Sequence, residues 1–589
     1  MKYLLSISIA LLFCAATVAQ NKPNVIVIVA DDLGNADVGY HNQDSKIPTP
    51  NIDLLASKGV KFSAGYVTAP VCGPSRAGIL TGCNQQRFGF DDNPGPFRSE
   101  PGVLAGIPLD IPIIPEYLKP EGYATACIGK WHVGHESDDY FPTRRGFDYF
   151  YGFLGGAASY YPNNNEGRTL FKNEKPVLVE NEYITDAFGR EAVEYINSKK
   201  DEPFFMYLAF NAVHGPLQEP PAVYQEPFKN MPQSKRRTLC AMQYAMDANV
   251  GRVVEALEKN NISENTLIFF VSDNGGKIKG NYSYNMPYKG EKGTLYEGGI
   301  RLPFFVVMPN DLPNNKTFSK PISTIDILPT VLSVASIETN SHIDGKDLTP
   351  FLKSKKEKDV HEYIYWRINQ RWSIRNANYK LVCNDDKKRP ELYHISKDIS
   401  ETKDLYNELP EIAAMLQKEY DRWSNEVGEP MWGWNPRVGK NVKHPEETFE
   451  NIHVEQVFKV GKNTLIDIVN NPKKQNINQS NTVLEINNTN ANSLGMSMKV
   501  PQFLLKRRFL KFKVLVDSEY SLTATLKNNK TKEDQIINIE RSKENKWQEI
   551  SIDYSKYKKA VNSIILNFNS DQSKVTEHKI FIDDIRFSD

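Results

Sequence analysis

The chain upstream of residue 440 alternates short apolar segments with longer stretches of mixed character. The apolar segments lie at 24–30, 125–129, 204–210 and 266–272, and each ends in polar residues or glycine. Such runs are typical of strands buried on both faces of a parallel sheet, with helices as the connections. The pattern predicts an α/β domain built on a large mixed, mainly parallel sheet that is sandwiched by helices.

The pattern changes near residue 440. Residues 441–589 hold two of the 35 glycines and three of the 35 prolines, and period-2 alternation occurs at 509–516, 547–552, 563–568 and 579–587. These strand signals predict an all-β sandwich. Just before it, a strand-like segment (372–382) and a helix-like segment (409–423) suit a small α+β subdomain. The asparagine-rich stretch 470–492 is predicted to be a long loop.

The first residues read as a targeting segment. Lys2 is followed by an apolar run at 4–16 and by the small residues Thr17 and Ala19. We interpret residues 1–19 as a secretory signal, and the alternative is a lipoprotein signal that uses Cys14. We therefore expect export, to the periplasm or outside the cell. The expected division is a signal peptide (1–19), an α/β domain (20–350), an α+β subdomain (351–440) and a β-sandwich (441–589).

Charge and hydropathy exclude some classes of partner. Lysine plus arginine and aspartate plus glutamate number 72 each, so no global field favours nucleic acid or an anionic membrane. After the first segment no run of 18 apolar residues occurs, so no membrane span is expected. An anionic ligand must therefore be held by local charges.

The cysteines form an odd set once the targeting segment is removed. Cys14 leaves with it, and five remain. An odd number in an exported protein indicates one thiol with a separate fate, for which Cys72 is the candidate. The other four are either paired in one of three ways or buried as free thiols.

Carboxylates follow two of the predicted strands. Asp31 and Asp32 come after the strand at 24–30, and Asp273 and Asn274 after the strand at 266–272. Ligands of open α/β sheets bind at the carboxyl ends of strands, so the two pairs can converge. Their oxygens suit a hard cation such as calcium better than zinc. The alternative is that both pairs cap helices or turns.

Cys72 lies in the sequence Cys72-Gly-Pro74-Ser-Arg76. Pro74 favours a first helical turn, so Cys72 is predicted at a helix N-terminus, where N–H groups stabilise negative charge. Arg76 is four residues on, one turn up the same face. The segment thus brings a nucleophile beside a cation. The alternative is a buried cysteine next to a solvated arginine.

Further cations and histidines follow strands or glycine-rich turns. Lys130 and His132 leave the strand at 125–129 and point the same way, and His214 follows the strand at 204–210. Lys292 lies in a glycine-rich stretch that lets the backbone approach a ligand closely. Each taken singly is more often a solvated lysine or a satisfied histidine. Together they form a constellation that could address one anion.

These residues carry a family resemblance. The segment from Cys72 to Arg76, with Thr81-Gly82 after it, resembles the maturation signal of the type I, formylglycine-dependent sulfatases of the alkaline phosphatase superfamily, as found in bacterial polysaccharide sulfatases. The resemblance runs from Lys22 to about Trp423, including the stretch 391–405, and does not cover the tail. It implies an alkaline phosphatase-like catalytic domain at 20–350 with a C-terminal sulfatase subdomain.

The resemblance also implies a set of site residues. A maturation enzyme would convert Cys72 to formylglycine (3-oxoalanine). Calcium would be held by Asp31, Asp32, Cys72, Asp273 and Asn274. Sulfate binding and proton transfer would fall to Arg76, Lys130, His132, His214 and Lys292. Lys289 is a near neighbour of Lys292, but the Gly-Thr pair that the family carries follows Lys292.

The family mechanism then assigns roles. The hydrate of residue 72 attacks sulfur, aided by calcium and Arg76. His214, with Lys292, donates a proton to the departing sugar oxygen, and His132 later removes the proton of the second hydroxyl. The expected activity is a sulfuric ester hydrolase acting on sulfated oligo- or polysaccharides of algal or host origin.

Two other functions remain open. One is a phosphonate or phosphate-ester hydrolase of the same superfamily, and the other is a sulfated-glycan binding protein whose cysteine is not matured. In the tail, Trp547 or Tyr554 could stack on sugar if the sandwich binds carbohydrate. Proximity to the motifs suggests a set of substrate-pocket residues: Arg87, Asp91, Asp92, His135 and Arg144.

Overall fold

The computed structural model describes residues 22–42, 45–94, 105–135, 137–162, 170–177, 182–386 and 388–432, together with the strands of the C-terminal part. The described residues up to 432 belong to one compact unit, and the described strands from Phe458 onward belong to a second. Residues 1–19, with the predicted signal, lie outside the described residues, as do Trp547 and Tyr554. Within the described part, no helix combines the length and the apolar character needed to cross a bilayer.

The first unit is built on a mixed sheet whose order is β11-β2-β10-β9-β1-β8-β4-β5-β6-β7. The five central strands from β9 to β5 run parallel, whereas β10 is antiparallel to β9. The bounds are β1 (Asn24–Ala30), β2 (Val60–Phe62), β4 (Ala124–Lys130), β5 (Tyr149–Phe153), β6 (Leu170–Lys172), β7 (Lys175–Val177), β8 (Phe204–Ala209), β9 (Thr266–Ser272), β10 (Phe304–Val307) and β11 (Lys316–Phe318).

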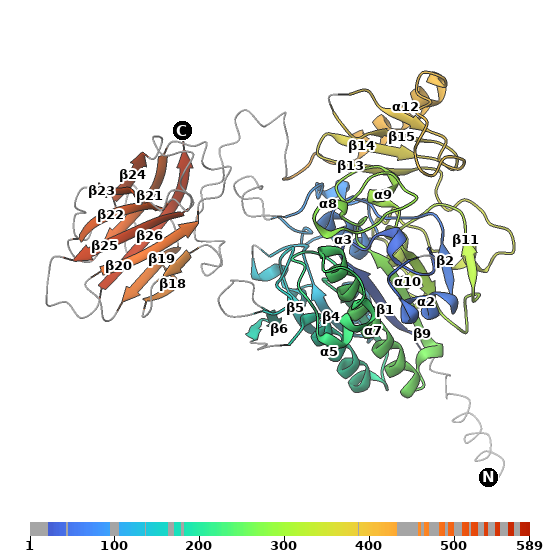
Figure 1. The fold of residues 1–589 in the computed structure, drawn as a ribbon, viewed down its shortest axis with the longest axis horizontal. Helices are drawn as coiled ribbons and strands as arrows, with labels where there is room; N and C mark the ends of the chain where they lie inside the picture. The colour runs from blue at the N-terminus through green and yellow to red at the C-terminus, as the bar shows by residue number, and fades with distance from the viewer. Residues whose placement is uncertain are drawn as a thin grey trace, which may run out of the picture. The chain divides into compact units, whose positions relative to one another are not determined.

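Helices cover this sheet on both faces (Figure 1). Their bounds are α2 (Pro50–Ser57), α3 (Cys72–Thr81), α4 (Ile114–Leu118), α5 (Ile184–Lys199), α6 (Ala222–Gln225), α7 (Lys235–Lys259), α8 (Ile278–Asn281), α9 (Glu297–Ile300), α10 (Ile327–Val334) and α11 (Thr349–Lys353). A continuous core joins β1, β8 and β4 to α5 and α7. Every residue of β1, β4, β8 and β9 is buried, which explains the long apolar runs of β1, β8 and β9.

Two smaller sheets complete this unit. A two-stranded sheet joins β3 (Gly65–Tyr66) to β12 (Ile322–Ser323), and a four-stranded antiparallel sheet has the order β13-β14-β15-β16. Its strands are β13 (Ile364–Ile368), β14 (Arg371–Arg375), β15 (Lys380–Cys383) and β16 (Glu391–Tyr393), and α12 (Pro410–Glu426) packs on it. The predicted strand at 372–382 is thus wrong in one respect: it is a hairpin, because Asn376 accepts two backbone N–H bonds and turns the chain.

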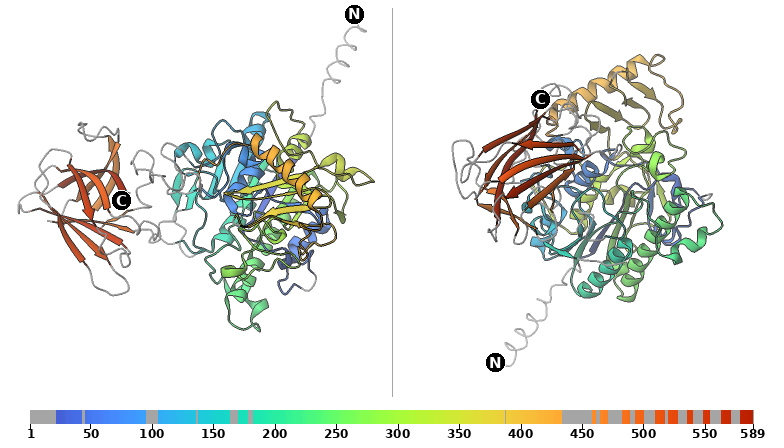
Figure 2. Two further views of the ribbon diagram at one scale, coloured as in Figure 1. Left: turned by 90° about the horizontal axis from the view of Figure 1, so that it is seen from above. Right: turned by 60° about the vertical axis from the view of Figure 1, so that its left-hand side comes forward.

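The second unit holds two five-stranded antiparallel sheets, β17-β20-β25-β22-β23 and β18-β19-β26-β21-β24. Figure 2 draws them as two layers. The strands are β17 (Phe458–Val460), β18 (Thr464–Asn470), β19 (Thr482–Asn488), β20 (Ser493–Lys499), β21 (Phe509–Val516), β22 (Tyr520–Lys527), β23 (Gln535–Ile539), β24 (Gln548–Asp553), β25 (Ser563–Ser570) and β26 (His578–Ser588). The predicted fold class is therefore confirmed.

The prediction of one long loop at 470–492 is wrong. It contains β19, which pairs with β18 and β26. Leu484 and Ile486 alternate with Glu485 in this segment. Asparagine on both sides masked this short alternation, and pairing with two neighbours supplies the stability that local propensity lacks.

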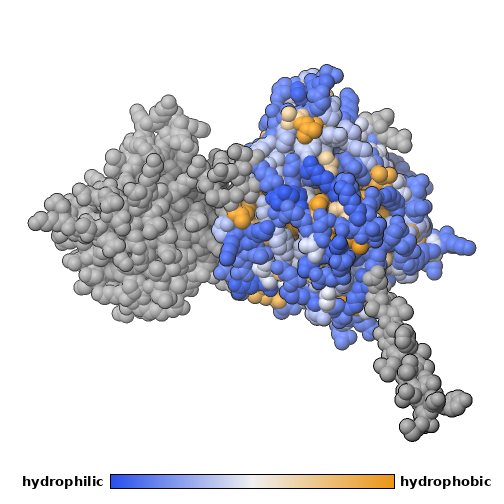
Figure 3. All heavy atoms as spheres, turned by 90° about the horizontal axis from the view of Figure 1, so that it is seen from below, coloured by the Kyte–Doolittle hydropathy of each residue, from blue (hydrophilic) through white to orange (hydrophobic). Residues whose placement is uncertain are grey.

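In the first unit, Figure 3 shows a largely hydrophilic face with apolar residues in small separate groups.

Candidate active site

The site lies at the carboxyl ends of the central strands. β1 ends at Ala30, so Asp31 and Asp32 follow it directly, and β9 ends at Ser272 before Asp273 and Asn274. Because β1 and β9 are parallel neighbours with Ala30 opposite Ser272, both pairs emerge at the same edge. The Asp32 N–H donates to Asp273 Oδ1 at 3.3 Å. The two pairs therefore converge as predicted, because the register of β1 and β9 places them at the same edge of the sheet.

Cys72 is the first residue of α3, and Val71 before it is extended. α3 ends at Gly82, whose φ of 65° is the left-handed conformation that glycine adopts without strain. The Cys72 thiol is buried and lies 3.7 Å from Asp31 Oδ1. Burial raises the pKa of this thiol to about 11, although Lys130 and Lys292 oppose the shift. The thiol is therefore protonated near neutral pH.

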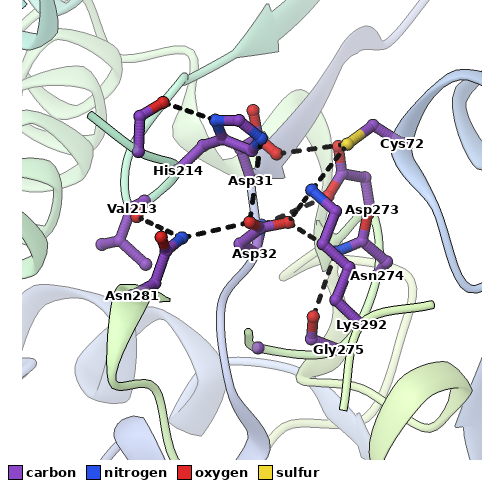
Figure 4. A network of polar contacts seen from close by, with 12 residues as sticks. Asp31, Asp32, Cys72, Val213, His214, Asp273, Asn274, Gly275, Asn281 and Lys292 are labelled. Atoms are coloured by element: carbon purple, nitrogen blue, oxygen red, sulfur yellow. Dashed lines mark hydrogen bonds and ion pairs between the residues drawn. The ribbon is translucent and has the colours of Figure 1, made fainter. Parts of the chain in front are cut away.

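Two lysine ammonium groups contact the aspartates. Lys130 Nζ lies 2.6 Å from Asp31 Oδ2, and both groups are fully buried. Lys292 Nζ lies 2.6 Å from Asp32 Oδ1 and donates to Cys72 Sγ at 3.1 Å. Burial disfavours the charged ammonium of Lys292, but Asp32, Cys72, Asp31 and Asp273 together outweigh burial and raise the pKa of Lys292 well above the ordinary value. Lys292 is thus a fixed cation that touches both Cys72 and Asp32 (Figure 4).

Arg76 joins the two strand ends from α3. Its Nε donates to Asp273 Oδ2 at 2.9 Å and its Nη1 to the Lys130 carbonyl oxygen at 2.8 Å, with no exposed side-chain surface. Burial opposes ionisation of Asp31, but Lys130, His214, Arg76 and Lys292 together hold its pKa well below the usual range. Burial and the neighbouring Asp31 instead raise the pKa of Asp273. The site therefore balances several buried charges of both signs.

The two histidines lie in different environments. His214 Nδ1 is 2.6 Å from the Gly215 carbonyl oxygen, which can only accept, so Nδ1 carries the proton and Nε2 is left to face Asp32 Oδ2 at 3.9 Å. Burial lowers the pKa of His132 well below its ordinary value, and Lys130 and Arg76 lower it further. His132 is therefore neutral near pH 7 and could accept a proton.

The donor atoms fit a metal ion. One atom each from Asp31, Asp32, Cys72 and His214 lie within 4.8 Å of one another. Asn274 Oδ1 is buried without a hydrogen-bond partner among the described residues, while its Nδ2 donates to Asp32 Oδ1 at 2.7 Å. A buried acceptor that lacks a partner is costly unless something positive binds it. These residues thus form a group that could hold a hard cation.

The structure also separates residues that the sequence left ambiguous. Lys289 donates to the Tyr393 hydroxyl at 2.8 Å and lies over the Tyr296 ring, whereas Lys292 reaches Cys72. Three of the suggested pocket residues form ion pairs: Arg87 with Asp344, Asp91 with Arg367 and Arg144 with Glu174. Asp92 accepts a hydrogen bond from Asn369 at 3.3 Å, and His135 lies close enough to His132 to lower the pKa of His132.

The described cysteines are all buried free thiols.

Sequence reasoning missed Asn281. Its Nδ2 donates to Asp32 Oδ2 at 3.1 Å and to the Val213 carbonyl oxygen at 3.4 Å. Asp32 therefore has Lys292 and Asn274 at Oδ1 and Asn281 at Oδ2 (Figure 4). The only local signal is that small polar residues alternate with large apolar ones from 281 to 286. That alternation does not reveal which set faces inward.

Comparison with known proteins defines the class. A family model described as Sulfatase matches residues 23–337, and one described as N-sulphoglucosamine sulphohydrolase, C-terminal, matches residues 290–426. The chain belongs to the sulfatase family and is a sulfuric ester hydrolase. The uncharacterized sulfatase YdeN of Escherichia coli (strain K12) is 33% identical over 400 residues, which cover 59% of this chain and 69% of that protein.

Other relatives carry more specific names. N-acetylgalactosamine-6-sulfatase of Sus scrofa is 31% identical over 388 residues, covering 62% of this chain and 72% of that protein. The solved structure of Ps i-CgsB in complex with k-i-k-neocarrahexaose is 36% identical, with a TM-score of 0.66 over 71% of this chain and 96% of that chain. The PsFucS1 sulfatase from Pseudoalteromonas sp. shares the fold, with a TM-score of 0.59 at 24% identity over 73% of this chain and 95% of that chain.

Proposed function

We propose that this sulfatase hydrolyses sulfate esters of sulfated oligosaccharides derived from polysaccharides, through a formylglycine at position 72 and a calcium ion. The observation that carries the proposal is the Lys292 ammonium, 3.1 Å from Cys72 Sγ and 2.6 Å from Asp32 Oδ1, within a cluster of buried cations. Such fixed charges stabilise the oxygens of a sulfuryl group as charge develops. The net reaction consumes water and releases inorganic sulfate and a sugar hydroxyl.

The substrate class rests on similarity. The protein crystallised with k-i-k-neocarrahexaose is 36% identical and matches 96% of its own length. N-acetylgalactosamine-6-sulfatase is 31% identical over most of its length. Both names point to sulfated sugars. We propose algal or host glycans as the source, and export directed by residues 1–19 to the periplasm or outside the cell would bring the enzyme to them.

The cysteine itself supports conversion to an aldehyde. Its thiol is buried and its pKa is raised to about 11, so the unmodified residue would be a weak nucleophile near neutral pH. As a hydrated aldehyde, residue 72 would supply an attacking oxygen and a second hydroxyl through which sulfate is released. The conversion implies a maturing enzyme as a partner, which would act on the segment from Cys72 to Arg76.

Calcium would be held by Asp31, Asp32, Asp273 and Asn274 with residue 72. Bound there, it would supply positive charge that favours an ionised oxygen at residue 72 and polarises the sulfate. The support is the donor set of carboxylates with the unpartnered Asn274 Oδ1. Hard cations of this kind prefer oxygen ligands.

The remaining residues bind the sulfate and transfer protons. Lys130 and Arg76 supply fixed positive charge, and Arg76 also orients Asp273. His214 acts in its doubly protonated form: Nδ1–H stays bound to the Gly215 carbonyl oxygen, and Nε2–H donates its proton to the leaving sugar oxygen, with the Lys292 ammonium beside it. His132, kept neutral by burial and by Lys130, accepts a proton when the aldehyde is restored.

The test combines chemistry at position 72 with a substrate panel. Mass spectrometry of the peptide that contains Cys72 should find an aldehyde in place of the thiol. Defined sulfated oligosaccharides should then release sulfate, and an aryl sulfate should be cleaved faster than an aryl phosphonate. An intact thiol in fully active enzyme, or preference for the phosphonate, would refute the proposal. Stoichiometric binding of sulfated glycan without turnover would instead favour the binding-protein alternative.

A further inference from the structure

The segment from Lys277 to Met286, which includes α8, presents an unusual alternation of burial beside the active site. Asn281, Ser283 and Asn285 are buried, whereas the residues between them are exposed. Ile278, Tyr282, Tyr284 and Met286 are 42%, 44%, 51% and 70% exposed, and we call them the exposed ridge. They are four of the ten large exposed apolar residues found among the described residues. Such clustering marks a binding surface.

The inward residues explain why the ridge faces solvent. Asn281 Nδ2 donates to Asp32 Oδ2 at 3.1 Å, and Ser283 Oγ donates to the Asp32 carbonyl oxygen at 3.4 Å. Asn285 exchanges hydrogen bonds with the backbone of Gly276 at 2.9 and 2.8 Å. With these three polar residues turned inward, Tyr282, Tyr284 and Met286, which alternate with them, are exposed. The polar residues, and not burial of the apolar ones, thus tie this segment to the active site.

Tyr284 is held in place by its backbone and by its ring. The Tyr284 carbonyl oxygen accepts from Ala36 N at 3.0 Å, and Tyr284 N donates to Asp37 Oδ2 at 2.9 Å. The Arg236 guanidinium lies 4.0 Å from the centre of the Tyr284 ring and is itself held by Asp37 at 2.6 Å. One ring face is thereby supported while half of the side chain stays exposed. A preorganised surface loses little entropy on binding.

The ridge starts on the leaving-group side of the site. Asp32 Oδ2 faces both Asn281, at 3.1 Å, and His214, at 3.9 Å, whereas Oδ1 faces Lys292 (Figure 4). In the proposed function His214 protonates the departing sugar oxygen. The remainder of the sugar chain must therefore leave the site past His214. The segment that carries Asn281 borders this path.

We propose that the exposed ridge, with Lys277 and Lys279, binds further residues of a sulfated saccharide chain beyond the ester that is cleaved; this inference rests on the proposed function. The apolar face of a pyranose ring stacks on an aromatic side chain whose polar tip stays wet. Lys277 and Lys279 are exposed and supply cations for sulfate groups. The Glu291 carboxylate accepts hydrogen bonds from the Ile278 and Lys279 N–H groups at 2.6 and 2.9 Å.

A protein partner fits the ridge less well. Stable protein interfaces bury about 800 Å² on each side, and four side chains with two flanking lysines cover only a part of that. An oligosaccharide fits this surface better. The ridge has separated aromatic rings and nearby cations, and it is continuous with a site for sulfated ligands. The structure therefore assigns to this surface a role in recognising chain length.

The test compares wild type with a Tyr282→Ala/Tyr284→Ala variant of the full chain. Leu54→Ala, at a residue that is 57% exposed on α2, is the matched control. The probes are an aryl sulfate and sulfated disaccharides and hexasaccharides derived from carrageenan, chondroitin sulfate and heparan sulfate. For the best-cleaved hexasaccharide, we expect kcat/KM of the variant to fall at least about tenfold. With the disaccharide and the aryl sulfate, the variant should stay within about twofold of wild type.

A Lys277→Gln/Lys279→Gln variant should show the same loss on the hexasaccharide, with a weaker salt dependence. Equal losses on long and short substrates, or no loss on the hexasaccharide, would overturn the inference. So would wild-type enzyme that cleaves the aryl sulfate but none of the saccharides, or a ridge variant whose main change is its oligomeric state. Wild type that cleaves neither class would instead contradict the proposed function.

Discussion

The Lys292 ammonium lies 3.1 Å from the Cys72 sulfur, although the two residues are 220 positions apart in the chain. Asp32 holds the ammonium from the other side at 2.6 Å. The backbone next to Lys292 is also fixed, because Arg371 Nη1 donates to the Gly293 carbonyl oxygen and Gly293 N to the Pro70 carbonyl oxygen. A residue of the small subdomain thus helps to place a cation at the site.

Replacing Lys292 should abolish most activity. Lys292→Met removes the cation beside residue 72 and leaves Asp32 without that partner, so we expect kcat on an aryl sulfate to fall by at least about a hundredfold. Lys289→Met is the matched control, because Lys289 lies against Tyr296 and Tyr393 instead of Cys72. Its kcat should stay within about fivefold of wild type. Similar losses in both variants would count against the assigned role.

Cys72→Ala should be folded but inactive. The side chain occupies the first position of α3 and makes only weak hydrogen bonds, so its removal should change the unfolding midpoint little. Loss of a nucleophile costs about four to six orders of magnitude in kcat. Sulfate release and thermal unfolding, measured on the same preparation, check both halves of the prediction. Residual activity near the wild-type level would contradict a reaction through residue 72.

Chelation should lower both activity and stability. A bound cation stabilises the native state by about 2.7 kcal/mol when its free concentration is a hundred times its dissociation constant. Removing it from Asp31, Asp32 and Asp273 leaves three buried carboxylates with fewer cations. We expect the unfolding midpoint to drop after exhaustive chelation and to recover with Ca²⁺, while Asn274→Ala should recover less. An unchanged midpoint with full turnover after chelation would exclude a structural and catalytic metal.

The buried pair of Glu401 and Lys380 should make stability depend on pH. Lys380 Nζ is 2.9 Å from both Glu401 and Glu297. Burial, which is the largest cause, and the charge of Glu297 together raise the pKa of Glu401 to about 7, although Lys380 opposes the shift. The native state therefore holds a proton that the unfolded chain has lost above about pH 4.3. This contribution to stability is present at low pH and is lost as pH rises through about 7.

The variant Glu401→Gln isolates this effect. Wild-type stability should fall relative to that of the variant between about pH 5 and about pH 8, with a slope of up to about 1.4 kcal/mol per pH unit. Denaturant unfolding at several pH values measures the difference. Parallel curves for the two proteins across this range would show that Glu401 titrates near its ordinary pKa.

Several features of the fold could be read from local pattern. The strands β1 and β9 carry apolar runs that end where the chain turns polar, so their bounds match the predicted ones. Pro74 marks the start of α3 because proline is accommodated in the first helical turn. The patterns of strands and helices extend over only a few neighbouring residues, so they can be recognised in a single sequence.

The sequence did not reveal one local turn or the contacts between distant residues. The hairpin of β14 and β15 reads as one strand until Asn376 is seen to close the turn. The ion-pair partners of Arg87 and Asp91 could not be read from the sequence, because each lies more than 250 positions away. Such ion pairs depend on how separate elements pack. No local signal identifies the partner.

The sequence by itself determined which chemical groups are available: the carboxylates after the strands, the cysteine at a helix start, and the cations in the turns. Tertiary structure alone decided that Lys292 and not Lys289 contacts Cys72, that Asn281 binds Asp32, and that Tyr282 and Tyr284 face solvent. The reason is physical: backbone periodicity sets the spacing of side chains along one element, whereas the direction each side chain faces at a shared site depends on the register and packing of strands distant in the chain.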